Sequence, residues 1–245
     1  MEIKVNAIVT RSVDYKDNDK ILTLYSLEKG KITANIKGVK KPKAKLKFAS
    51  EPFCFAEYIL AEKGGRYTVI GASYIDSFYD LRLNLQKYYL SACVIDVINN
   101  LIEDGDEDTA LFTSTIEAIK NICYTSNEKV ALAYYLNYLA ERLGYGISET
   151  ACASCGEVIN GRVFFNYLDA TFSCEECRTQ SYSEITLDTY TAFNIVKNAE
   201  INEIKSVIVD DGKATKLIKF LLYYLSVKTE VKLKSATSLN EFFAL

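Results

Sequence analysis

Residues 53–70 read FCFAEYILAEKGGRYTVI, two segments rich in aromatic and β-branched side chains separated by Gly64 and Gly65. A glycine pair between two such segments is a strong signal for a β-hairpin. Toward the N-terminus lie three more β-prone segments, Ile3–Val9, Ile21–Tyr25 and Ile32–Ile36. Five short strands in so short a stretch favour a small barrel. Their number and spacing fit a five-stranded OB barrel, although periodicity alone does not separate it from an SH3-like barrel.

Beyond the hairpin, from about residue 81, apolar residues recur at helical spacing. Three helical stripes come first, and Glu103–Asp108 between the first two is interpreted as a solvated acidic loop. A break at Gly144–Gly146 ends the third stripe, and helical spacing resumes near Leu187. The stripes and the last helix are marked by Leu90, Val94, Val97, Ile98 and Leu101; by Phe112, Ile116, Ile119 and Cys123; by Leu132, Leu136, Leu139 and Leu143; and by Leu217, Ile218, Leu221, Leu222 and Leu225.

These patterns predict an α+β chain. We expect an OB-fold domain at residues 1–80 and an α-helical domain at residues 81–245, with a small cysteine-containing module inserted at residues 148–180. No basic segment followed by an apolar one suggests a signal peptide, and no apolar run reaches about 18 uncharged residues. We therefore expect a cytoplasmic protein without membrane association, in a compartment where thiols stay reduced.

Histidine is absent from the 245 residues. Without it no Ser-His-Asp or Cys-His nucleophile can form, and the commonest general base is missing. Catalysis by carboxylates or lysines does not require histidine. However, the chain has neither a Walker phosphate loop nor a Gly-x-Gly-x-x-Gly segment that would accompany such catalysis. We therefore expect a protein that is not an enzyme.

Two Cys-x-x-Cys pairs form the sharpest local signal: Cys152 with Cys155, and Cys174 with Cys177. Their separation is typical of a Cys₄ zinc ribbon, in which four thiolates close the coordination shell around a structural ion. We expect one structural Zn²⁺ per chain, held by a hairpin between the pairs; two disulfides or four unligated thiols are the alternatives. The other three cysteines fall on strand or helix patterns and are interpreted as buried small hydrophobes: Cys54, Cys93 and Cys123.

Charge is divided unevenly along the chain. Residues 1–80 hold 14 basic and 10 acidic residues, although the whole chain has a net charge of −3. Lysines recur from Lys29 to Lys47 without a single acid, and Gly38 and Pro42 predict an irregular, mobile segment instead of a helix. Such a segment suits phosphate backbones, whose neutralisation releases counterions. The lysines are Lys29, Lys31, Lys37, Lys40, Lys41, Lys43, Lys45 and Lys47.

Aromatic side chains in or beside the predicted barrel could stack on bases, but most of them must fill the barrel core. These aromatics are Phe48, Phe53, Phe55, Tyr58 and Tyr67.

Several segments in order along the chain carry a family resemblance. They are AIVTRSVDY at 7–15, DKILTL at 19–24, GKI at 30–32, KGVKKPK at 37–43, Pro52-Phe53, and Leu143-Gly144-Tyr145 preceding Cys152-x-x-Cys155-Gly156. With these segments the chain resembles the bacterial RecO family of DNA repair and recombination mediators. The likeness spans nearly the whole chain.

The resemblance implies an N-terminal OB fold, a helical C-terminal domain and a zinc module. It also implies that the chain binds single- and double-stranded DNA at the bacterial nucleoid, anneals complementary strands, and works with RecR to place RecA on DNA coated by single-strand-binding protein. The acidic tail of single-strand-binding protein would bind the helical domain. DNA-contacting basic residues of the family match Arg11, Lys37, Lys40, Lys41 and Lys43, and the charge of the run adds Lys45 and Lys47 as candidates.

Three departures and two rival functions accompany this interpretation. The basic loop contains only lysine where the family usually has arginines. Ile147-Ser148 replaces a proline that is common before the first cysteine pair, and Asp169-Ala170 replaces a Gly-Gly pair that is common before the second. An RNA-binding OB protein with a zinc site agrees equally well with charge and fold. A zinc hydrolase or deaminase would need an open coordination position or a His-x-Glu motif, and neither is present.

Overall fold

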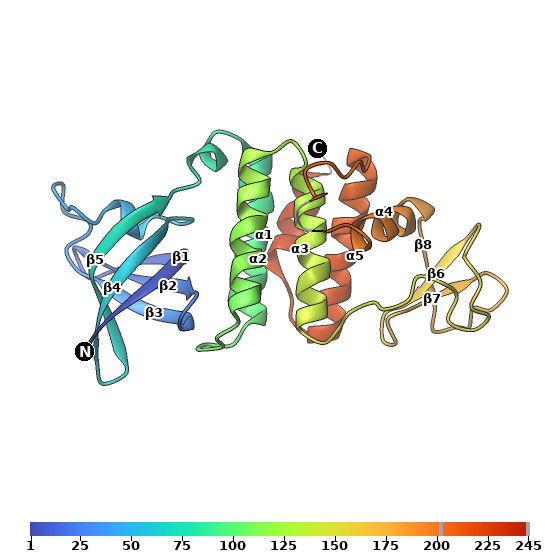
Figure 1. The fold of residues 1–245 in the computed structure, drawn as a ribbon, viewed down its shortest axis with the longest axis horizontal. Helices are drawn as coiled ribbons and strands as arrows, with labels where there is room; N and C mark the ends of the chain where they lie inside the picture. Colours follow the sequence, from blue (N-terminus) through green and yellow to red (C-terminus); the bar gives the residue numbers. More distant parts are fainter. Residues whose placement is uncertain (201–202, 244–245) are drawn as a thin grey trace. The chain divides into compact units, whose positions relative to one another are not determined.

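Alternating apolar residues close the N-terminal strands into a barrel in the computed structural model, which describes residues 1–200 and 203–243 (Figure 1). The strands lie in the closed order β1-β2-β3-β5-β4. Only β3 and β5 run parallel; the other neighbours are antiparallel. This closed barrel, followed by helices, confirms the predicted OB-type α+β fold. The strands are β1 (Glu2–Tyr15), β2 (Asp19–Ser26), β3 (Gly30–Ile36), β4 (Phe55–Lys63) and β5 (Arg66–Asp76).

Alternate residues along the strands point into the barrel and form its core, which is the expected consequence of strand alternation. Tyr58 fills part of this core, and its hydroxyl donates a hydrogen bond to the Ala49 carbonyl, 2.9 Å away. The core therefore joins β4 to the short 3₁₀ helix η1 (Phe48–Ser50). The core residues include Val5, Ala7, Val9, Leu22, Leu24, Ile32, Ala34, Ile36, Val39, Leu60 and Val69.

The chain divides into two compact units, residues 1–85 with 95–117 and residues 86–94 with 118–245. Helices α1 (Leu85–Leu101) and α2 (Thr109–Tyr124) therefore contribute to both. In the first unit, Phe112 of α2 packs on outward-facing rings of the barrel, 5.5 Å from Tyr25 and 6.2 Å from Phe55 between ring centroids. Part of the outer barrel surface is thereby covered by helix.

The acidic loop between these helices is exposed, as expected, but it is also fastened to the barrel. The Gly105 N–H donates to the Lys31 carbonyl at 2.9 Å, and the Lys31 ammonium donates to the carbonyls of Asn99 (2.9 Å) and Ile102 (2.5 Å). Lys31 is buried and also lies 3.4 Å from Asp104. One member of the lysine run is thus a structural residue that binds the C-terminal end of α1.

In its described residues the second unit contains four further α-helices and a small sheet of order β7-β6-β8. The helices coincide with the predicted stripes except for the last, which was not predicted. No helix in the described part of the chain is long and apolar enough to cross a membrane. The elements are α3 (Glu128–Arg142), β6 (Val163–Asn166), β7 (Thr171–Cys174), β8 (Ser183–Ile185), α4 (Leu187–Lys197), α5 (Asp211–Thr229) and α6 (Lys234–Phe242), with the 3₁₀ helix η2 (Tyr79–Arg82) between β5 and α1.

Candidate nucleic-acid interface and candidate metal centre

Residues 37–47, here called the lysine loop, connect β3 to η1. The predicted absence of an α-helix is confirmed, but the segment is more regular than expected because successive turns close it. The N–H groups of Lys41, Ala44 and Lys47 donate to the carbonyls three residues earlier, at 3.2, 3.0 and 3.4 Å. These turns give the loop a defined backbone path.

Two apolar side chains hold the lysine loop against the barrel. Val39 is buried in the barrel core, and Leu46 packs partly against the same core. With these two residues turned inward, the loop's lysines are turned outward and all are exposed. The lysines are Lys37, Lys40, Lys41, Lys43, Lys45 and Lys47, and no acidic residue lies among them.

The β1–β2 turn contacts the beginning of the lysine loop. An Asp19 carboxylate oxygen accepts the Gly38 N–H at 2.8 Å, and the Asn18 carbonyl accepts the Lys40 N–H at 3.0 Å. The Lys40 ammonium lies 2.6 Å from a carboxylate oxygen of Asp14. The hydrogen bond from Lys40 holds the pKa of Asp14 below its usual value. This turn therefore fixes the loop's backbone and neutralises one of its charges.

Arg11 lies on the barrel itself, directly after a β-bulge at Thr10 in β1. It is exposed and pairs with Thr23 of β2, which pairs in turn with Thr33 of β3. Thr33 lies two strand spacings from Arg11, and Lys37 follows Thr33 by four residues, just beyond the end of β3. The Cα atoms of Arg11 and Lys37 are therefore roughly 16 Å apart. The candidate basic residues thus occupy one three-stranded face and the loop that leaves it.

The aromatic candidates are mostly unavailable for stacking. Tyr58 and Phe53 are buried, and the rings of Phe48, Phe55 and Tyr67 are half-buried. The exposed aromatic rings on the barrel strands are instead Tyr15, at the end of β1, and Tyr74, in β5. The sequence prediction missed both because they lie beyond the predicted ends of their strands.

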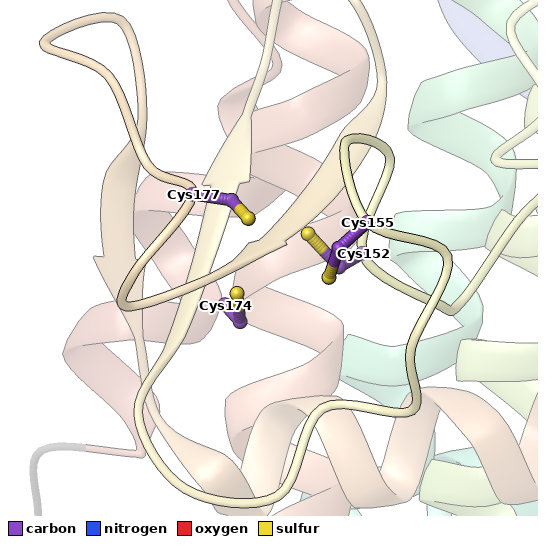
Figure 2. A group of neighbouring side chains, drawn as sticks. All are labelled: Cys152, Cys155, Cys174 and Cys177. Carbon is purple, nitrogen blue, oxygen red and sulfur yellow. The ribbon is translucent and has the colours of Figure 1, made fainter.

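The four paired cysteines come together in the second unit (Figure 2). Their Sγ atoms all lie within 4.8 Å of one another, and the sulfurs point into a shared space. Four sulfurs bound tetrahedrally at about 2.3 Å lie about 3.8 Å apart, so a small contraction of the cluster would satisfy a metal ion. No disulfide joins any of the four in this structure.

Local backbone geometry forms the two cysteine turns. Gly156, at φ +75°, donates its N–H to the Cys152 carbonyl at 2.8 Å and so closes the first turn. Burial opposes ionisation of the Cys152 thiol, but hydrogen bonds, chiefly from the backbone N–H groups of Cys155, Cys174 and Ser154, more than offset it and lower its pKa to about 5. These hydrogen bonds favour thiolate at Cys152, whereas the hydrogen bond with the Cys174 thiol raises the pKa of Cys177 to about 12, so a metal ion that binds all four sulfurs must displace that proton.

The predicted hairpin between the cysteine pairs is present as β6 and β7, with Phe165 opposite Phe172. Arg162 at its start lies 2.6 Å from Glu175 and 2.5 Å from Glu184 of β8. Ala170, which replaces the family's second glycine, sits at the hairpin turn with φ +58°. An alanine therefore adopts there the left-handed conformation that usually calls for glycine.

Comparison with known proteins gives consistent matches along the chain. Residues 1–78 match the family model described as Recombination protein O N terminal, and residues 82–237 match the one described as Recombination protein O C terminal. The chain is 25% identical to the DNA repair protein RecO of Acetivibrio thermocellus, with 93% of this chain and 92% of the relative covered. It is 26% identical to that of Clostridium novyi (97% and 93% covered) and 32% identical to that of Desulfitobacterium hafniense (73% and 65% covered).

Proposed function

The chain belongs to the RecO family of DNA repair proteins, and from this premise we propose that it binds single- and double-stranded DNA through its barrel and anneals complementary strands. As a repair protein it acts at the bacterial nucleoid, in the cytoplasm.

One observation carries the proposal: six exposed lysines lie on a loop whose backbone is held by turns and by a buried valine. Phosphate contacts made by such a loop do not depend on base sequence, because lysine offers a point charge to each phosphate. Sequence-independent contact is what a protein needs when it must act on any stretch of damaged DNA. About five phosphate contacts to a single strand would give a log-log salt slope near −3.5.

Arg11 extends this basic surface onto the barrel. The strands 2 and 3 face of OB barrels is a common binding surface for oligonucleotides, and Arg11 lies beside that face through its pairing with Thr23. Arginine can contact a phosphate with two parallel hydrogen bonds, which would orient the strand relative to the loop. We assign DNA contact to Arg11, Lys37, Lys40, Lys41, Lys43, Lys45 and Lys47.

Strand binding and annealing can be tested together. Fluorescent oligonucleotides report binding by anisotropy in dilute buffer, and a donor and acceptor pair on complementary strands reports annealing. We expect binding to both single and double strands, and pairing faster than in buffer alone. Absence of both activities would overturn the proposal, and a strong preference for RNA over a DNA strand of the same sequence would favour an RNA-binding role instead.

For the cysteine cluster we propose one structural Zn²⁺ per chain, bound by Cys152, Cys155, Cys174 and Cys177. Support comes from the all-sulfur donor set and from the spacing of the sulfurs. Four thiolates leave no coordination position for water or substrate, so the ion would stabilise the fold and take no part in catalysis, in agreement with our proposal that the protein is not an enzyme. Elemental analysis of protein purified without added metal tests the identity and stoichiometry of the ion.

Our proposal for the partner proteins is supported by family membership alone. We propose that the chain binds RecR and the acidic C-terminal tail of single-strand-binding protein, and so helps to load RecA on coated DNA. A labelled tail peptide should bind the purified chain, and RecA filaments should form faster on coated strands when this chain and RecR are both added. Loading that is independent of this chain would contradict the mediator role.

A further inference from the structure

Asp14, near the end of β1, is the only acid in the described residues whose carboxylate forms an ion pair with a lysine of the lysine loop. Its Oδ2 atom lies 2.6 Å from the ammonium of Lys40. The neighbouring turn residues Asn18 and Asp19 accept the backbone N–H groups of Lys40 and Gly38. The carboxylate is thus held beside the loop by its own strand, and the loop is held beside the carboxylate by the turn.

Lys40 differs from the other lysines of the loop in this respect. Within residues 1–200 and 203–243, the ammonium groups of Lys37, Lys41, Lys43, Lys45 and Lys47 form no ion pair or hydrogen bond. Their charges are available to a ligand at once. A phosphate that approaches Lys40 must first displace a carboxylate, which has the same charge sign and offers the same kind of acceptor oxygen.

We propose that Asp14 is an internal competitor for phosphate at Lys40 and thereby lowers the affinity of the basic loop for nucleic acid. The inference rests on the proposed function and deepens it, because it identifies an acidic residue that tunes DNA binding. Asp14 occupies on Lys40 the position that a phosphate oxygen of the bound strand would take.

The effect should be modest and specific. Both partners are partly exposed, at 62% for the Asp14 side chain and 33% for that of Lys40. Exposed ion pairs of this kind contribute little, equivalent to roughly a twofold to fivefold change in an equilibrium constant. A ligand with many phosphates can bind the other lysines while Lys40 stays paired with Asp14, whereas a single phosphate at Lys40 cannot bind without displacing the carboxylate. The pair therefore favours extended strands over single phosphate groups.

The test compares charge removal at two positions in the same hairpin. Asp14→Asn removes the competing charge, and Asp17→Asn is the matched control, since Asp17 is an exposed acid of the adjoining turn with no ion pair in the described residues. Each substitution is made in the natural chain and in a Lys40→Ala background. Binding of a labelled oligo-dT strand is measured by anisotropy at several salt concentrations.

We expect Asp14→Asn to tighten strand binding about twofold to fivefold, and more than Asp17→Asn does. In the Lys40→Ala background, Asp14→Asn should have no larger effect than Asp17→Asn, because the pair no longer exists. Equal effects of the two substitutions in the natural chain would overturn the inference, as would a larger effect of Asp14→Asn that persists without Lys40. Asp14→Ala serves as a second variant without an amide oxygen.

The design separates this inference from the proposed function. If the natural chain binds the strand and Lys41→Ala weakens binding, DNA binding by the loop stands whatever Asp14 does. If the natural chain does not bind the strand in dilute buffer, both the inference on Asp14 and the proposed function are wrong.

Discussion

Cys152 and Phe172 form a parallel β-bridge, so the first cysteine turn lies directly against the hairpin strand that leads to the second. The ring of Phe172 packs in turn on Tyr190 and Phe193 of α4, with centroids 5.2 and 5.6 Å apart. Through this aromatic contact the cysteine cluster is connected to the helices of its own unit. Loss of the cluster should therefore destabilise those helices.

Cys174→Ser should lower the metal content from about one ion per chain to well below half, because a hydroxyl is a poor substitute for a thiolate ligand. Structural zinc sites contribute on the order of 10 kcal/mol, so the helical unit should unfold at a markedly lower temperature. Circular dichroism and elemental analysis measure both effects. Cys123→Ala is the control; it lies outside the cluster and should keep the metal and cost about 1 kcal/mol. A Cys174→Ser protein with full metal content and unchanged melting would contradict a structural metal site.

Lys31→Met should destabilise the barrel unit without weakening strand binding. The substitution leaves the carbonyls of Asn99 and Ile102 without the ammonium that binds them, which costs about 1 to 3 kcal/mol in the free energy of unfolding. Lys29→Met removes an exposed pair with Glu107 and should cost less than about 1 kcal/mol. Urea unfolding compares the two variants. A Lys31→Met protein that is as stable as the natural chain, but binds DNA poorly, would place Lys31 in the interface instead.

Gly30→Ala tests the contact between the β2–β3 turn and the acidic loop. Gly30 has φ +57°, and a Cβ atom there would lie 2.1 Å from the Asp106 carbonyl oxygen. Backbone strain and the clash together should cost about 2 to 4 kcal/mol of unfolding free energy. Gly64→Ala is a matched control, since it has φ +59° but no atom within 4 Å, and it should cost about 1 kcal/mol. Equal stability of the two variants would show that the acidic loop is not docked at Gly30.

Arg11→Ala should weaken binding to single and double strands alike, because a phosphate contact carries no sequence information. The log-log salt slope should become shallower by about 0.7 on single strands. Arg11→Lys should restore the slope but only part of the affinity, because lysine cannot contact a phosphate through two parallel hydrogen bonds. Anisotropy titrations with both ligands test this expectation, and an unchanged slope for Arg11→Ala would mean that the guanidinium faces solvent in the complex.

Features determined by local pattern were predictable from the sequence. Alternation and the Gly64-Gly65 pair predicted the barrel strands, and the Cys-x-x-Cys spacing predicted which cysteines would meet. The first strand was predicted to end at Val9, but β1 continues to Tyr15, because the bulge at Thr10 interrupts the alternation and the residues that follow are polar or exposed.

Features determined by contacts distant in sequence were not predictable. A run of lysines contains no information on burial, so Lys31 could not be distinguished from its exposed neighbours before the end of α1 was seen to contact it. The Asp14–Lys40 pair likewise depends on how the β1–β2 turn meets the lysine loop. Helix α6 spans only nine residues, and although its few apolar residues recur at helical spacing, the pattern is too short to identify a helix from the sequence.

Salt dependence of strand binding tests the central claim most directly. A Lys40→Ala, Lys41→Ala, Lys43→Ala triple variant is compared with the natural chain and with a control that replaces three exposed lysines of the helical unit, Lys205, Lys232 and Lys234, by alanine. The lysine-loop variant should bind oligo-dT more weakly and flatten the log-log salt slope by up to about 2, while the control keeps the natural slope. Equal slopes for all three proteins would contradict DNA binding by the lysine loop.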